Sequence, residues 1–407
     1  MKKSVALLAG ATLAAGGGGV AAALLWSGWA GMLAALILLV AAGGAALVTF
    51  GGHIAIERQR RIDEAEPDLF GELNRRRAES VVLGGNVPRV GGLQRALART
   101  LGHGFVVGDG VRIRSYEAIC ATLDAEGCLE GVSFMEEMKA FCGRNARVYR
   151  VLDKIYDYGR SREMRALDRS VLLVGLRCDG AAHGACDAAC YLVWKEAWLE
   201  PASHCERLSM TPVLQQQDGR APIEPGKVFN CQYTELTAAS QPRVPSGLRG
   251  LFEPLIVGNA TAAGWWVVAL TRLFNTFQDK RGGAGFPSRP KSGGQTSKLG
   301  EPVKAGDWVR VRTPAEIAET LDAKGNHRGL WFDRDMLKHC GHSYRVLGRV
   351  HRIIDIRSAT MIPMKTACII LDDVHFSGEF QWFGEQHDFL YWREAWLQPV
   401  APPATCH

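Results

Sequence analysis

The chain has 407 residues, a formal net charge of +6 and eleven cysteines. This length exceeds one ordinary hydrophobic core and predicts about two domains plus extra segments, at roughly 150 residues per domain. The charge is too small for a chain of this size to indicate a nucleic-acid-binding protein, although it fits a protein near an anionic membrane surface. The cysteines lack the dense spacing of a secreted disulfide protein, so we expect reduced thiols in the cytoplasm.

Residues 1–53 are predicted to form a transmembrane helical hairpin. The segments Val5–Trp26 and Trp29–Phe50 contain no charged residue, and each is long enough to cross ~30 Å of hydrocarbon as a helix. Lysines precede the first segment and arginines follow the second, so the positive-inside rule places both ends in the cytoplasm. We therefore expect the inner (cytoplasmic) membrane, with membrane lipid as a partner and the body in the cytoplasm. A cleaved signal peptide that includes the first segment, or no insertion at all, is the alternative.

Residues 111–201 match residues 309–399 at a constant offset of 198 residues, without a gap. The copies share VRIRS with VRVRT, a TLDA sequence, a Cys-Gly pair and EAWL. A match of this length in one frame predicts one fold made twice. We place the first repeat unit at 109–201 and the second at 305–400.

Each copy has the pattern of a small β unit. Val111–Arg114 alternates apolar and basic residues, as a strand with one buried face does, and short helical segments separate it from a later strand pair. The predicted fold class is therefore mainly β (α+β), with two SH3-like small barrels that carry short helical insertions.

Two segments lie outside the copies. Residues 54–108 are rich in Arg and Glu and predict a solvated helical stalk. Residues 202–304 connect the copies and include Leu255–Phe277, which we expect to be a helix in the membrane interface or packed between the barrels, with a third span as the alternative. A basic, Gly/Pro/Ser-rich linker, Lys280–Lys304, follows this helix.

One group of cysteines and a histidine separates the first copy from the second. Cys178, His183 and Cys186 stand at metal-ligand spacing in a loop with few apolar residues to order it. At the equivalent places the second copy has Phe376, Gln381 and Gly384. Because the fold does not need these three side chains, we predict a metal site in the first copy and aromatic packing in the second.

Structural zinc takes four nitrogen or sulfur ligands, so the cluster needs one more donor. Cys142, in the shared Cys-Gly pair, is the predicted fourth ligand, and Cys190 is the alternative because it shares a helical face with Cys186. The predicted cofactor is Zn²⁺ in a structural site, since three thiolates make zinc a poor Lewis acid. The competing interpretations are that the cysteines are small buried residues, or that Asp179 and Asp187 serve a catalytic metal.

The motifs resemble a group of uncharacterised bacterial proteins with tandem units. That group carries C-D-G-x-x-H-x-x-C before F-W-K-E-A-W-L, to which Cys178–Cys186 and the later WKEAWL correspond here. The resemblance extends to Gly306-Asp-Trp-Val-Arg-Val and to the connecting segment at Cys231-Gln-Tyr-Thr-Glu-Leu. The resemblance implies tandem units, but the group has no known activity that it could indicate for this chain. Members usually have a second Cys/His set, which this chain lacks.

The sequence contains no P-loop, GxGxxG, GxSxG or HExxH motif. We therefore expect a membrane-tethered binding or scaffold protein with another protein as its partner and no nucleic acid. The alternative is a zinc- or thiol-dependent accessory enzyme in envelope polysaccharide or natural-product assembly, with Cys231 or a zinc-bound water as the reactive group.

Overall fold

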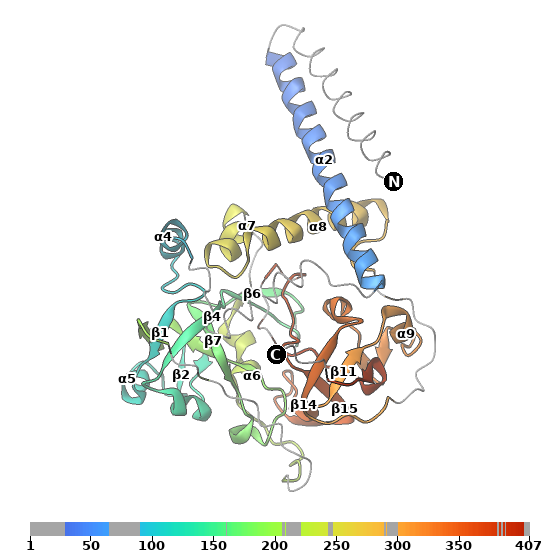
Figure 1. Cartoon of the computed structure of the whole chain (residues 1–407). Helices are drawn as coiled ribbons and strands as arrows, with labels where there is room; N and C mark the ends of the chain where they lie inside the picture. The colour runs from blue at the N-terminus through green and yellow to red at the C-terminus, as the bar shows by residue number, and fades with distance from the viewer. Residues whose placement is uncertain are drawn as a thin grey trace. The chain divides into compact units, whose positions relative to one another are not determined.

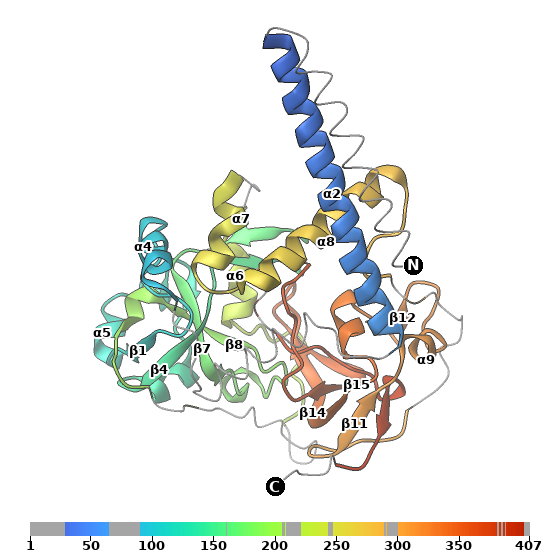
Figure 2. The same cartoon turned by 45° about the horizontal axis from the view of Figure 1, so that its top comes forward.

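The computed structural model describes residues 29–64, 90–159, 161–205, 208, 221–242, 247–288, 290, 300–380, 382–383, 386 and 388–402 (Figures 1 and 2). The chain divides into two compact units. The first consists of Met1–Arg61 with Trp266–Ser288, and the second of Ile62–Trp265 with Arg289–His407.

The first unit is built from helix α2 (Trp29–Asp63) and most of helix α8 (Ala262–Arg281). Among the residues that the structure describes, no helix combines the length and apolar character needed to cross a membrane. The first predicted span, Val5–Trp26, lies outside the described residues, so the hairpin stays a prediction.

Glycines allow α2 and α8 to approach closely. A Cβ on Gly51 would overlap the Leu270 carbonyl, and one on Gly52 would lie 3.1 Å from the Phe274 ring. A substitution at Gly51 would therefore push the two helices apart.

The second unit contains both repeats, and their elements lie at equivalent positions. The first repeat contains β1 (Gly110–Ile113), α5 (Tyr116–Cys120), β2 (Cys128–Leu129), β3 (Val132–Ser133), η1 (Glu136–Phe141), β4 (Asn145–Val151), β5 (Lys154–Tyr156), β6 (Met164–Ala166), β7 (Ser170–Arg177), η2 (Ala181–His183), β8 (Tyr191–Lys195), η3 (Glu196–Trp198) and β9 (Leu199–Pro201). The second contains β11 (Trp308–Val311), α9 (Pro314–Ala318), β12 (Asn326–His327), β13 (Leu330–Trp331), η4 (Arg334–His339), β14 (Ser343–Ile354), β15 (Met361–Leu371), η5 (Glu394–Trp396) and β16 (Leu397–Pro399). The short helices of the second repeat begin and end 198 residues after those of the first, as expected of one fold made twice.

Each repeat curls an antiparallel sheet into a half-barrel. The strand order is β8-β7-β4-β1-β9 in the first repeat and β15-β14-β11-β16 in the second. The register also repeats, since Val111 lies opposite Pro201 and Val309 lies opposite Pro399. These sheets, with short helices between their strands, agree with the predicted mainly β class.

The tryptophans that both copies share form the core. Trp194, Trp198, Trp392 and Trp396 are fully buried. Phe134 meets Trp198 edge to face at 5.4 Å, and Phe332 meets Trp396 at 5.2 Å. The repeated aromatic positions are thus explained by packing.

The segment between the repeats is helical, but Leu255–Phe277 is not the single helix that we predicted. Helix α7 (Gly247–Ile256) ends just inside this segment, and α8 begins at Ala262. Asn259 lies in the break, where its side chain accepts a hydrogen bond from the Val151 N–H at 3.0 Å and donates to the Val151 carbonyl at 2.7 Å. These bonds to the end of β4 explain why the helix stops there. The other elements of this segment are α6 (Gln232–Ala239) and the short strand β10 (Gln241–Pro242).

Candidate metal centre

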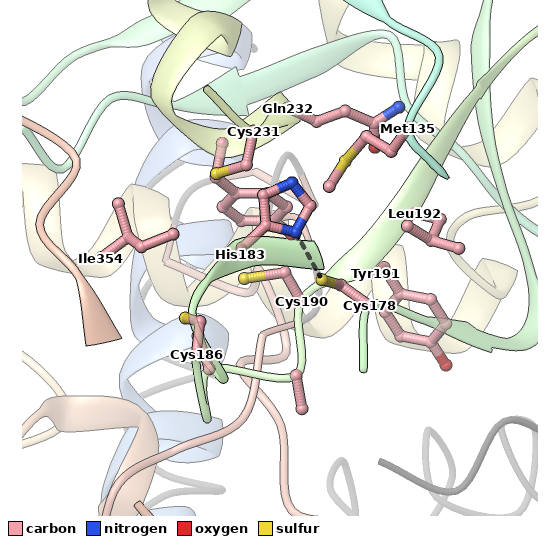
Figure 3. Close-up of a pocket in the computed structure, with 13 residues that line it drawn as sticks. Met135, Cys178, His183, Cys186, Cys190, Tyr191, Leu192, Cys231, Gln232 and Ile354 are labelled. Atoms are coloured by element: carbon pink, nitrogen blue, oxygen red, sulfur yellow. Dashed lines mark hydrogen bonds between the residues drawn. The ribbon is translucent and has the colours of Figure 1, made fainter. Parts of the chain in front are cut away.

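A small pocket in the first repeat gathers most of the predicted ligands. Cys178, His183, Cys186 and Cys190 line it, together with Cys231 from the start of α6 (Figure 3). The pocket has about 30 Å³ of space for water-sized molecules. That volume is enough for an ion or a water, whereas ligand sites usually measure about 300–1,000 Å³.

Two of the residues that line the pocket, Cys178 and His183, meet a third side chain of different chemistry, Glu137, which does not line it. The Cys178 Sγ lies 3.0 Å from Glu137 Oε1 and 4.0 Å from His183 Nδ1, and His183 Nδ1 lies 3.5 Å from Glu137 Oε1. The ligand atoms of the three residues all lie within 4.8 Å of one another. A thiol, an imidazole and a carboxylate at these distances could hold a metal ion.

One carboxylate oxygen of Glu137 makes no hydrogen bond with the described residues. Its side chain is only 4% exposed, and its Oε2 is buried with no hydrogen-bond partner among the residues that the structure describes. The nearest lysine in sequence on η1, Lys139, instead contacts Glu136 at 2.6 Å. A buried carboxylate is costly without a cation, so the environment of Glu137 favours a bound cation.

In the second repeat, a lysine compensates the equivalent buried carboxylate. Asp335 occupies the position equivalent to Glu137 and is also buried, but Lys338 contacts its Oδ1 at 2.8 Å and Ser377 donates to it from both its N–H and its hydroxyl. The residue equivalent to Lys338 in the first repeat is Ala140. The repeat with the Cys/His set therefore lacks the ammonium group that its twin provides.

Two glycines shape the loop that carries the thiols. Gly180 and Gly184 have φ values of +74° and +64°, and a Cβ on Gly180 would overlap the Cys186 carbonyl. The turn lets the Gly180 N–H donate to the Cys178 Sγ at 3.3 Å. Such a bond favours the thiolate, which is the form that binds metals.

Burial keeps the thiols protonated when no metal is present. It raises the pKa of Cys186 to about 11, despite hydrogen bonds from the Ala188 and Ile354 N–H groups. It also raises the pKa of Cys178, with Glu137 as the next cause, and the pKa of Cys190. A metal must displace these protons when it binds.

Cys142, the predicted fourth ligand, is not among the residues that line the pocket. Burial raises the pKa of its thiol, and its acidic neighbours are Cys120 and Glu117. Cys178, His183, Cys186 and the alternative ligand Cys190 line the same pocket. Of these four, only Cys178 and His183 belong to the group of ligand atoms within 4.8 Å of one another that the described residues contain. Sequence reasoning missed Glu137 as a donor. The sequence did contain a signal for this donor. Both copies have an acidic residue at this position, but only the second copy has a lysine three residues later.

In the second repeat, the loop equivalent to residues 178–190 packs aromatic side chains, in part against the connecting segment. Phe383 is 3% exposed, and Trp382 meets Trp265 edge to face at 6.1 Å. The Trp382 indole N–H donates to the Gly250 carbonyl at 2.9 Å. Gln381 and Gly384 lie outside the described residues. Aromatic packing in this loop agrees with the prediction from the sequence.

No protein-family model matches the chain, no curated protein matches it, and no solved structure is significantly similar to it. The resemblance to the bacterial tandem-repeat group stays a prediction that rests on the quoted motifs.

Proposed function

We propose that this protein is a membrane-tethered binding or scaffold protein in which a structural zinc ion holds the first of two SH3-like units in its working conformation. One observation carries the metal assignment: Lys338 neutralises Asp335 in the second repeat, whereas Glu137 in the first has Cys178 and His183 beside it and no equivalent lysine. Thiol and imidazole donors favour zinc among the common divalent ions.

The size and chemistry of the pocket support a structural role. A space of about 30 Å³ leaves no room for an organic substrate beside a metal. The thiolate is the nucleophilic form of cysteine, and burial raises the pKa of Cys178, Cys186 and Cys231 away from neutral pH. These properties favour a scaffold over a thiol-dependent enzyme.

The loop that carries the proposed ligands, residues 178–190 (the metal-binding loop), also forms part of the contact between the repeats. Asp187, next to Cys186, accepts hydrogen bonds from the His351 and Arg352 N–H groups at 2.8 and 3.3 Å. Its own N–H donates to the Arg352 carbonyl at 3.0 Å. A metal that orders this loop would therefore also order its attachment to strand β14.

The equivalent loop of the second repeat makes a similar contact with the first repeat. Gln386, in the loop equivalent to the metal-binding loop, accepts a hydrogen bond from the Tyr156 N–H at 3.4 Å and donates to the Tyr156 carbonyl at 3.3 Å. Arg177 lies between the rings of Tyr191 and Phe389, at 3.7 and 4.1 Å from their centroids. Tyr191 and Phe389 are equivalent residues, so the two repeats meet about an approximate two-fold relation. This reciprocal contact supports a scaffold that presents both units in one fixed arrangement to a protein partner.

Hydrogen exchange of the full chain tests the structural role of the metal. We expect chelation to accelerate exchange at the His351 and Arg352 amides, because the loop that carries Asp187 loses its order. The amide of Val309, which pairs within the second repeat, serves as the internal control. Unchanged exchange at His351 and Arg352 after the metal has been removed would contradict the proposed role.

The membrane tether is supported by the first unit. Leu47 and Phe50 of α2 are exposed, and Trp266, Leu273 and Phe277 form an exposed apolar stripe at helical spacing on α8. Basic residues end both helices: Arg60 and Arg61 in α2, and Lys280 and Arg281 in α8. Apolar stripes with basic ends suit the interface of an anionic bilayer.

Reporter fusions in cells test this placement. A reporter fused after Pro399 should be active in the cytoplasm and should sediment with the inner membrane, because the basic residues after Phe50 resist translocation. Deletion of residues 1–53 should release the fusion from the membrane fraction. Periplasmic activity, or an unchanged soluble fraction in the full-length fusion and the deletion, would contradict the tether.

A further inference from the structure

We propose that Cys231, outside both repeats, is a ligand of the same metal, so that the metal joins the connecting segment to the first repeat. This inference rests on the proposed zinc site and names its fourth donor as Cys231, in place of Cys142. The complete set is then Cys178, His183, Cys186 and Cys231, with Glu137 beside it.

The position of Cys231 carries the first part of the argument. It lines the same pocket as Cys178, His183 and Cys186, although 45 residues separate it from Cys186 in sequence (Figure 3). Structural zinc sites typically combine a close pair of ligands with donors from another chain segment. Cys231 provides that second segment, whereas Cys142 does not reach the pocket.

The place of Cys231 at the end of a helix suits an anionic ligand. Cys231 is the N-cap residue of α6, so its side chain lies at the amino-terminal end of that helix. This end of a helix favours a negatively charged group such as a thiolate. Cys190 also lines the pocket, but it comes from the same loop as Cys178 and Cys186, whereas Cys231 comes from a second chain segment. Cys231 is therefore the better candidate for the fourth ligand.

The next residue fixes Cys231 in place. The Gln232 side chain accepts a hydrogen bond from the Val193 N–H at 2.8 Å and donates to the Val193 and Ser133 carbonyls at 2.8 Å each. Gln232 is only 2% exposed, so the first turn of α6 is anchored in the first repeat without any metal. A donor held in this way loses little conformational freedom when the metal binds.

The following residue reaches the other repeat. The Tyr233 hydroxyl donates to Asp388 Oδ1 at 2.7 Å. Three consecutive residues therefore contact the metal pocket, the first repeat and the second repeat. Metal ligation by Cys231 would make the connecting segment a part of the contact between the repeats.

Cobalt substitution counts the thiolate ligands. We would load chelated full-length protein with Co²⁺ and compare wild type with Cys231→Ser and Cys142→Ser, since thiolate-to-cobalt charge-transfer absorption scales with the number of thiolates. Loss of one of three thiolates should lower this absorption by about one third, or abolish binding. Cys142→Ser should match wild type.

The outcomes separate this inference from the proposed function. Full absorption in Cys231→Ser would overturn the role of Cys231 and leave the metal site intact. Failure of wild type to bind Co²⁺ or Zn²⁺ would overturn both.

Alkylation of wild type gives a second readout that needs no folded variant. Iodoacetamide should label Cys231 more slowly in zinc-loaded protein than in chelated protein, as metal-bound thiolates are shielded. Equal labelling rates in the two states would contradict ligation by Cys231.

Discussion

Chelation of the metal, or His183→Gln, should unfold the first repeat and leave the second folded. Structural zinc supplies on the order of 10 kcal/mol of apparent binding free energy in small domains, which is comparable to the whole stability of a domain. The first repeat would lose that contribution, and Glu137 Oε2 would stay buried with no hydrogen-bond partner among the described residues. Calorimetry should show two transitions in the zinc-loaded chain, of which only one moves. Acid should have the same effect, because protons compete with zinc for the thiolates.

A matched variant can give the first repeat the chemistry of the second. Ala140→Lys, combined with Cys178→Phe, His183→Gln and Cys186→Gly, places the equivalent second-repeat residues around Glu137. We expect the variant with all four substitutions to bind no zinc and to be more stable than chelated wild type. The variant with the other three substitutions but without Ala140→Lys should be less stable than the variant with all four. A first-repeat transition that is insensitive to chelation in wild type would contradict the structural role of the metal.

Removal of the Lys338 ammonium should strongly destabilise the second repeat. The side chains of Lys338 and Asp335 are 12% and 2% exposed and lie 2.8 Å apart. Breaking a buried ion pair by removing one partner costs about 3–5 kcal/mol, because the remaining charge is left without compensation. Lys338→Met, which retains most of the aliphatic stem, should lower the free energy of unfolding by an amount of this size in urea denaturation.

A double-mutant cycle distinguishes lost charge pairing from lost packing. Asp335→Asn should recover much of the stability that Lys338→Met removes, since a neutral amide can still interact with Ser377. Lys324→Ala, a change in the same repeat away from this pair, should have little effect. Equal destabilisation by Lys338→Met with and without Asp335→Asn would show that the pair is not what stabilises this loop.

The fold could largely be predicted because local patterns determine its elements. The alternation at Val111–Arg114 gives a strand with Val111 and Ile113 fully buried, and the fixed offset of 198 residues recurs in the element boundaries. The break between α7 and α8 was not predicted. It depends on the hydrogen bonds of Asn259 to Val151, a contact between residues 108 positions apart.

The candidate site could be predicted only where its residues are close in sequence. Cys178, His183 and Cys186 share one glycine-containing loop, so their spacing revealed them. Cys231 reaches the pocket through the anchoring of Gln232 on Val193, a tertiary contact that no spacing encodes. Glu137 was missed because its burial and its contacts with Cys178 and His183 depend on the tertiary structure.

The zinc content of the purified full-length chain tests the central claim most directly. Metal analysis of wild type, Cys178→Ser, His183→Gln and the matched second-repeat variant Phe376→Ser requires no assumption about partners or activity. We predict one zinc per chain in wild type and in Phe376→Ser, and none in Cys178→Ser or His183→Gln. A metal-free wild type, or one zinc retained in both Cys178→Ser and His183→Gln, would contradict a structural metal centre in the first repeat.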